Sequence, residues 1–165
     1  MTAAPHRILV VANETVGGRA LIEAVKGRAE AAHKRTEPFH VTVICPQNQP
    51  RSGYVIYEDS VRAAAENRLQ MTLAQLREVG IEADGEVMDP DPFSATMDAI
   101  DAYGADEIII STHPDTRSGW LRRDLVDRVR DASGLPVEHV VVDLEADRTD
   151  VTRTQIGRAS CRERE

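Results

Sequence analysis

The sequence predicts one α/β domain built on a doubly wound parallel sheet. Short apolar runs, such as residues 8–11 and 107–110, alternate with longer stretches whose apolar residues recur at helical spacing. Continuous apolar runs are typical of strands that helices cover on both faces. Because strand and helix patterns alternate along the whole chain, the sheet is expected to be parallel, with helices on both faces.

Five strands are expected. They cover residues 8–11, 39–45, 81–87, 107–110 and 137–142. Pro46 is expected to stop the second strand, because proline cannot donate a ladder hydrogen bond. Residues 81–87 alternate apolar and polar side chains, and this alternation predicts a half-exposed strand at one edge of the sheet.

Four helices are expected between the strands. The second runs from about Glu58 to Val79 and ends at Gly80, a residue that favours helix termination. Asp91 is predicted to cap the third helix, with Pro92 at its first position. The core-facing residues are expected to be Leu21, Ala24, Val25, Ala29 and Ala32 in the first helix, Phe93, Met97 and Ile100 in the third, and Leu121, Leu125, Val129 and Ala132 in the fourth.

Length and composition fit a single cytoplasmic domain. The chain has 165 residues and is 41% hydrophobic but only 4% aromatic, so small aliphatic side chains must fill the core. Its net charge of −8 disfavours binding to nucleic acid or to anionic membranes. No apolar stretch is long enough to span a bilayer, and the two cysteines form neither a disulfide framework nor a metal-binding pair, which indicates a reducing compartment.

The domain is expected to occupy residues 7–144. Residues 1–6 are interpreted as a loose N-terminus. Residues 145–165 lack apolar periodicity and are expected to be a disordered or non-native tail. The last stretch, residues 158–165, does not resemble the rest of the domain and is left out of the fold prediction.

Five segments of the chain resemble the universal stress protein family. They are RILVVAN (7–13), FHVTVI (39–44), LREVGI (76–81), ADEIIISTH (105–113) and LPV followed by VVV (135–142). The resemblance covers roughly residues 7–143. It implies a role in stress response and a five-stranded parallel sheet in the order 3-2-1-4-5. Ligands in such sheets bind at the carboxyl ends of the strands where the strand order reverses, here between strands 1 and 4.

The chain departs from the ATP-binding members of that family in their phosphate-binding residues. Those members carry an aspartate after the first strand, where this chain has Asn13. They also carry a glycine-rich loop after the fourth strand, where this chain keeps only Gly119, out of register. Pro114 removes a backbone donor there, and Asp115 and Asp124 add negative charge. ATP is therefore expected to bind weakly or not at all.

An adenine nucleotide in an altered pose is the candidate ligand. The candidate nucleotide-binding residues are Asn13, Thr15, Val41, Ser111, Thr112, His113, Arg117 and Ser118. Asn13 and Thr15 are equally well explained as helix caps. His113 with Asp115 is better explained as part of a surface loop than as a metal site, because further ligands are lacking. The basic residues around Arg117 could bind an anion or pair with nearby aspartates, and the two alternatives are even.

Three classes of function compete. The leading hypothesis is a non-catalytic module that acts by self-association and partner contacts. The alternative is a nucleotide-binding regulatory protein with an altered phosphate loop between the fourth strand and the last helix. An enzyme of the wider adenine nucleotide α hydrolase-like group is least favoured, because the sequence shows no convincing general base, nucleophile or metal set.

A homodimer is expected to form through the last strand. In the order 3-2-1-4-5 this strand lies at an edge, where Val140, Val141 and Val142 place apolar side chains on both faces. The opposite edge carries Glu82 and Asp84 and is expected to repel a partner. Family members that dimerise through this strand imply the same arrangement. In the alternative interpretation, the tail after Asp143 covers the edge.

Truncation after Glu145 is expected to leave the melting temperature unchanged, because the removed tail lacks any apolar face that could pack on the domain. Differential scanning calorimetry of the full chain and the truncated chain measures this. A large loss of stability in the truncated chain would show that the tail packs on the domain.

Overall fold

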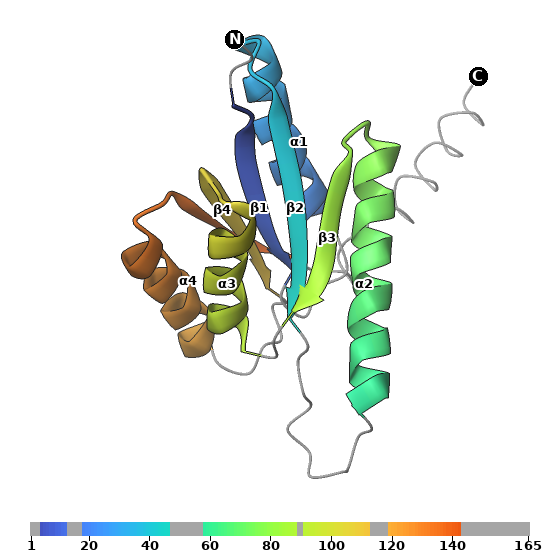
Figure 1. Ribbon diagram of the computed structural model, residues 1–165, viewed down its shortest axis with the longest axis vertical. Coiled ribbons are helices and arrows are strands. Elements are labelled where there is room, and N and C mark those ends of the chain that lie inside the picture. Colours follow the sequence, from blue (N-terminus) through green and yellow to red (C-terminus); the bar gives the residue numbers. More distant parts are fainter. Residues whose placement is uncertain (1–3, 13–17, 47–57, 89–90, 113–118, 143–165) are drawn as a thin grey trace, which may run out of the picture.

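The computed structural model describes residues 4–12, 18–46, 58–88, 91–112 and 119–142, without the side chains of residues 58–61 and 119–123. Strands and helices alternate along this chain (Figure 1). The strands are β1 (His6–Ala12), β2 (Phe39–Pro46), β3 (Ala83–Met88), β4 (Glu107–Thr112) and β5 (Val137–Val141). The helices are α1 (Arg19–Lys34), α2 (Glu58–Glu78), α3 (Pro92–Tyr103) and α4 (Gly119–Ser133).

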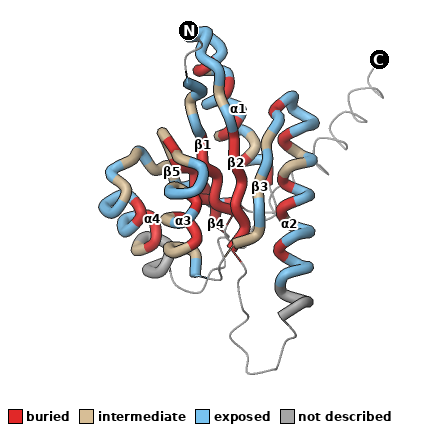
Figure 2. Tube along the Cα trace, in the orientation of Figure 1, coloured by how far each residue is buried: buried red, intermediate tan, exposed pale blue. Residues whose placement is uncertain are grey.

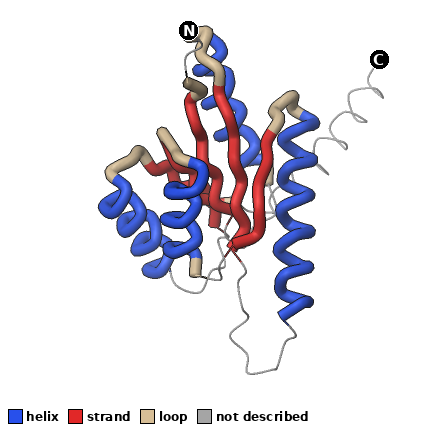
Figure 3. The backbone as a smooth tube through the Cα atoms, in the orientation of Figure 1, coloured by secondary structure: helices blue, strands red, loops and turns tan. Residues whose placement is uncertain are grey.

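The strands form one parallel sheet in the order β3-β2-β1-β4-β5, as predicted. The central strand β1 pairs with β2 on one side and with β4 on the other, so that Ile8 lies opposite both Val41 and Glu107. Helices α1 and α2 pack on one face of the sheet, and α3 and α4 pack on the other (Figure 3). The alternation of elements therefore predicted both the parallel pairing and the two helical layers.

Two apolar clusters hold the sheet between the helix layers. In β1, Ile8 and Val10 belong to the cluster beneath α1 and α2. Leu9 and Val11 belong to the cluster beneath α3 and α4. Because successive side chains of a strand point to opposite faces, a strand covered on both sides must be apolar throughout. Figure 2 shows this central burial as a red band through the middle strands.

The helix ends follow the predicted signals. Asp91 is the N-cap of α3, and its carboxylate accepts a hydrogen bond of 3.1 Å from the backbone N–H of Ser94. The Ser94 hydroxyl also donates to this carboxylate at 2.7 Å, and this bond is the main reason that the pKa of Asp91 is lowered. Gly80 and Gly104 follow α2 and α3 with φ of 84° and 76°, a region that glycine enters without strain.

The core face of α3 differs from the prediction. Ala95, Thr96 and Ala99 are the residues that α3 buries, because small side chains let this helix approach the sheet closely. Phe93 and Ile100 face the core as predicted, since they are partly buried and pack against the cluster beneath α3 and α4. Met97 is also partly buried, but it is not among the residues that pack against either cluster.

Two smaller expectations also need correction. Ala132 is exposed in α4, whose buried residues include Leu125, Val126 and Val129. Pro46 is the last residue of β2 rather than the residue after it, and it pairs with Met88. Proline is tolerated there because the strand needs no further donor beyond its end.

Charged side chains tie the amino ends of the strands together. Glu107 at the start of β4 lies 3.1 Å from the ring Nε2 of His6 and 3.4 Å from Arg28 Nε. Arg28, from α1, also lies 2.8 Å from a carboxylate oxygen of Glu138 in β5. His6 is the first residue of β1, so the strand begins one residue before the expected domain boundary.

The edge strand β3 depends on a glycine. Its exposed and half-exposed residues alternate as predicted. At Gly85, a Cβ atom would collide with the carbonyl oxygen of Val43 and would lie 2.9 Å from Leu69 Cδ1. Leu69 belongs to α2, so the missing side chain allows α2 to pack directly on the β2–β3 pair.

Gly85→Ala is therefore expected to destabilise the domain by about 1–3 kcal/mol, because the added methyl group overpacks the contact between β3 and α2. Gly27→Ala is the matched control. A Cβ at Gly27, inside α1, meets nothing within 4 Å, so this change should stabilise by about 0.5–1 kcal/mol. Urea unfolding of both variants measures the effects, and equal stabilities would contradict the packing argument.

Candidate functional site

The strand order reverses between β1 and β4. These two strands are neighbours, and Ala12 pairs with Ser111 at their carboxyl ends. The helix that follows β1 packs on one face of the sheet, and the helix that follows β4 packs on the other. The helices that follow these two neighbouring strands therefore lie on opposite faces, and this is the position where open α/β sheets bind ligands.

Two predicted site residues lie at this position. Three isoleucines in β4 give way to Ser111 and Thr112, and both polar side chains are fully buried. Ser111 Oγ donates a hydrogen bond of 3.4 Å to the carbonyl oxygen of Val11. Thr112 Oγ1 is hydrogen-bonded to the ring Nε2 of His139 at 2.7 Å. Because neighbouring strand residues face opposite sides, one hydroxyl is fixed on each face of the sheet at its carboxyl end.

Val41 is not brought to this position. It is the third residue of β2, fully buried, and it pairs with Ile8 and Ala83 within the cluster beneath α1 and α2. The strand ends five positions further along, at Pro46, which is a distance of about 16 Å. The structure therefore places Val41 in the core. The other predicted nucleotide-binding residues lie outside the described residues: Asn13, Thr15, His113, Arg117 and Ser118.

The N-terminus of α1 is a site feature that the sequence prediction undervalued. The N-cap of this 16-residue helix is the buried residue Gly18, which has no side chain to satisfy the first backbone N–H groups. The first turn contains no acidic residue. Unsatisfied N–H groups and the helix dipole together favour an anion at such an end. The candidate residues named from the sequence include none between Thr15 and Val41, so this helix start was not among them.

A second missed feature is Arg68 of α2. Its Nη2 atom donates a hydrogen bond of 3.4 Å to the carbonyl oxygen of Pro46, the last residue of β2. Arg68 interrupts the apolar stripe formed by Ala65, Leu69 and Leu76. A charged residue within a buried helix face is the feature of the sequence that could have identified it. Because α2 packs along β2, this stripe carries Arg68 to the carboxyl end of the strand.

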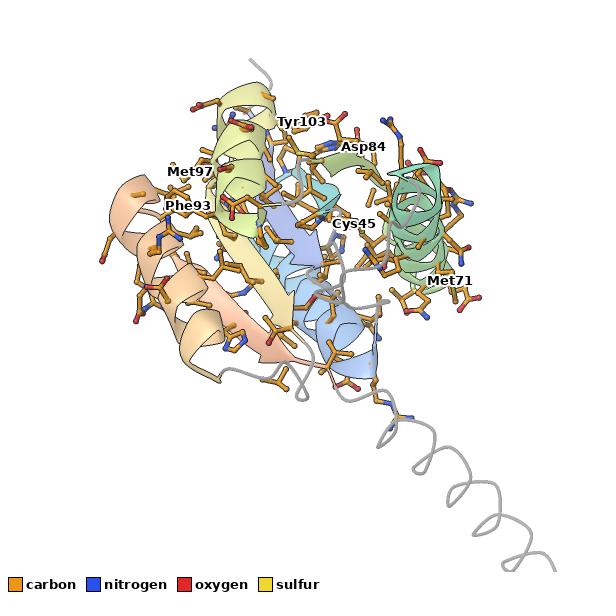
Figure 4. The ribbon with its side chains drawn as sticks, turned by 90° about the horizontal axis from the view of Figure 1, so that it is seen from below. Cys45, Met71, Asp84, Phe93, Met97 and Tyr103 are labelled. Atoms are coloured by element: carbon orange, nitrogen blue, oxygen red, sulfur yellow. The ribbon has the colours of Figure 1, made fainter. Side chains whose placement is uncertain are left out.

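Cys45 lies beside this arginine and is chemically inert. Its side chain is fully buried between the sheet and α2, as Figure 4 shows from below the view of Figure 1. Burial raises the pKa of the Cys45 thiol to about 11, and the nearby charge of Arg68 lowers it only in part. The thiol is therefore neutral at pH 7 and is a poor nucleophile.

The three valines predicted at the dimer edge divide into two groups. Val140 and Val142 are 9% and 0% exposed, and they belong to the cluster beneath α1 and α2. Val141 points to the other face and is 45% exposed. Within the described chain, β5 pairs only with β4. Val141 is thus the one valine of the three that offers apolar surface outside the core.

Metal-ligand clusters and membrane-spanning helices are both absent from the described ranges. No group of three or more His, Cys, Asp or Glu residues there is arranged to hold a metal ion. None of the described helices is both long and apolar enough to cross a membrane.

Solved structures that are similar to this chain include universal stress proteins. One from Archaeoglobus fulgidus is 21% identical, with a TM-score of 0.53 over 81% of this chain and 93% of that chain. The structure of that organism's protein in complex with dAMP has a TM-score of 0.52 at 21% identity and covers 85% of this chain and 99% of its own. A family protein from Arabidopsis thaliana with AMP bound is 13% identical, with a TM-score of 0.53 over 86% and 95%.

The sequence comparisons found no counterpart. No protein-family model and no curated protein sequence matches the chain. At the identities above, the structural likeness establishes the fold, including the strand order on which the site depends. The chain therefore has the universal stress protein fold.

Proposed function

We propose that the chain is a non-catalytic regulatory protein that binds an adenine nucleoside monophosphate at the carboxyl ends of β1 and β4. The observation that carries this proposal is the N-terminus of α1, where Gly18 leaves backbone donors without a side-chain cap. Two proteins of the same fold support it, because their structures contain dAMP and AMP. A cytoplasmic location stays a prediction from composition.

A monophosphate suits this chain better than a triphosphate. Backbone donors near glycines hold the phosphates of ATP in the glycine-rich loop of ATP-binding members, and this chain lacks that loop. Asp124 lies in the second turn of α4, where its carboxylate is 3.9 Å from Arg128. Asp115, which is outside the described residues, adds a second negative charge to the same segment of sequence. Each added phosphate would increase the repulsion from these carboxylates.

AMP is accordingly expected to bind at least about tenfold more tightly than ATP, a difference of about 1.4 kcal/mol in binding free energy. Isothermal titration calorimetry with AMP, ADP and ATP, each with and without magnesium, measures the order. Tight stoichiometric binding of ATP with magnesium, or no binding of any of the three nucleotides, would refute the proposal.

A variant pair tests the position of the site in the same calorimetry. Ala20→Asp places a carboxylate in the first turn of α1, where it competes with an anionic ligand for the backbone donors. Gly27→Asp adds the same charge in the middle of the same helix, at an open position. AMP binding should fall in the first variant and persist in the second. Equal effects of the two changes would place the site elsewhere.

Self-association through β5 is a second proposed function, which the exposure of Val141 favours. The two edges of the sheet differ in character. Asp84 and Glu86 are exposed on β3, whereas β5 exposes Val141 among the described residues. An edge with free backbone groups and an apolar side chain favours pairing, and a twofold antiparallel contact would satisfy both copies. Charge at the β3 edge leaves β5 as the edge where a second copy fits.

Val141→Lys is expected to convert a homodimer into a monomer, because two lysines would meet across the twofold contact. Met71→Lys is the matched control, since Met71 is also 45% exposed and lies on α2, which packs beside β2 and β3 at the side of the sheet away from β5 (Figure 4). Size-exclusion chromatography with light scattering measures the masses. A monomeric wild-type protein at high micromolar concentration would refute β5 pairing.

A further inference from the structure

Arg68 is an arginine for which the described residues supply no counter-ion. Among the arginines that the structure describes, it alone is not exposed. No carboxylate of a described residue lies within 4.0 Å of it, although most of the exposed arginines form ion pairs. Its Nε atom is buried and donates no hydrogen bond. The bond from Nη2 to the carbonyl oxygen of Pro46, at 3.4 Å, is long.

This arrangement is costly unless an anion completes it. Arginine stays charged at every accessible pH, and a partly buried charge without a partner loses hydration without compensation. The thiol of Cys45 interacts with the charge of Arg68, but its pKa of about 11 keeps it neutral. The described side chains therefore supply no negative charge, whereas a ligand phosphate would supply one.

The position of Arg68 relates it to the nucleotide site. It contacts the end of β2, and β2 is the direct neighbour of β1, with Ile44 opposite Val11. Adjacent strands are about 4.8 Å apart, so the carbonyl oxygen of Pro46 is about one strand spacing from the end of β1 and about two, roughly 10 Å, from the end of β4. A mononucleotide bound across the strand ends would therefore have Arg68 within reach.

We propose that Arg68 binds the phosphate of the nucleoside monophosphate, so that the phosphate lies at the end of β2 and not at the segment after β4. The proposal rests on the proposed nucleotide-binding function and names the residue that makes the protein prefer a nucleoside monophosphate to the nucleoside without a phosphate. A guanidinium suits this role because its fork of N–H donors matches two phosphate oxygens at once. The long Nη2 bond to Pro46 and the unbonded Nε atom leave the guanidinium with incomplete hydrogen bonding, and a phosphate at the guanidinium end of the side chain would complete it.

The test compares AMP with adenosine, which lacks only the phosphate. The wild-type protein is expected to bind AMP at least about tenfold more tightly than adenosine, because a phosphate gains charge-assisted hydrogen bonds. Arg68→Gln should lose most of this preference while its affinity for adenosine stays unchanged. Arg77→Gln is the matched control, since Arg77 is exposed on the same helix and forms no ion pair with a described residue. It should keep the wild-type preference.

The outcomes separate this proposal from the one on which it rests. If Arg68→Gln keeps the tenfold preference for AMP, Arg68 does not bind the phosphate, and nucleotide binding itself still stands. If the wild-type protein binds neither AMP nor adenosine, both proposals are overturned. Should Arg68→Gln fail to fold, Arg68→Met keeps the length of the side chain and its apolar stem, and the same comparison applies to it.

Discussion

The burial of β1 on both faces is the constraint on which the rest of the structure depends. Ile8 and Val10 face one helix layer, while Leu9 and Val11 face the other, so this strand can only be central. A parallel neighbour on each side then requires crossover helices on both faces. That arrangement places α1, which follows β1, and α4, which follows β4, on opposite faces of the sheet. The position of the candidate site thus follows from where the first apolar run is buried.

The fold was largely predictable because each element carries its own local signal. The run of isoleucines at 108–110, the Asp91-Pro92 helix start and the alternating residues of β3 each indicate one structure without knowledge of their neighbours. The inward face of α3 was not predictable in this way. Helical spacing of large apolar residues predicted Phe93 and Ile100, which pack against the cluster, but it missed the small buried residues Ala95, Thr96 and Ala99. The distance between helix and sheet decides which side chains are buried, and that distance is set by tertiary packing.

The site was less predictable because two of its described parts carry little sequence signal. One is a set of backbone N–H groups at the start of α1, and the other is an arginine that is distant in the sequence. A sequence search for ligand-binding side chains finds Ser111 and Thr112, which are at the right end of β4. The same search passes over Gly18, which has no side chain to cap the backbone N–H groups of α1. It also misplaces Val41, whose burial in the core depends on its position along β2. Arg68 is 20 or more residues from every other site residue in the sequence, and only the packing of α2 brings it to the end of β2.

The two ends of the sheet differ in how their positive charges are balanced. At the amino ends of the strands, Arg7 and Arg28 each lie within 3.6 Å of a carboxylate, so little net field remains there. At the carboxyl ends, the described residues include the uncapped N-terminus of α1 and the unpaired charge of Arg68. A chain with a net charge of −8 repels anions over most of its surface. An anionic ligand therefore needs local positive charge, and among the described residues the N-terminus of α1 and Arg68 are the features that would supply it at the carboxyl ends of β1 and β2.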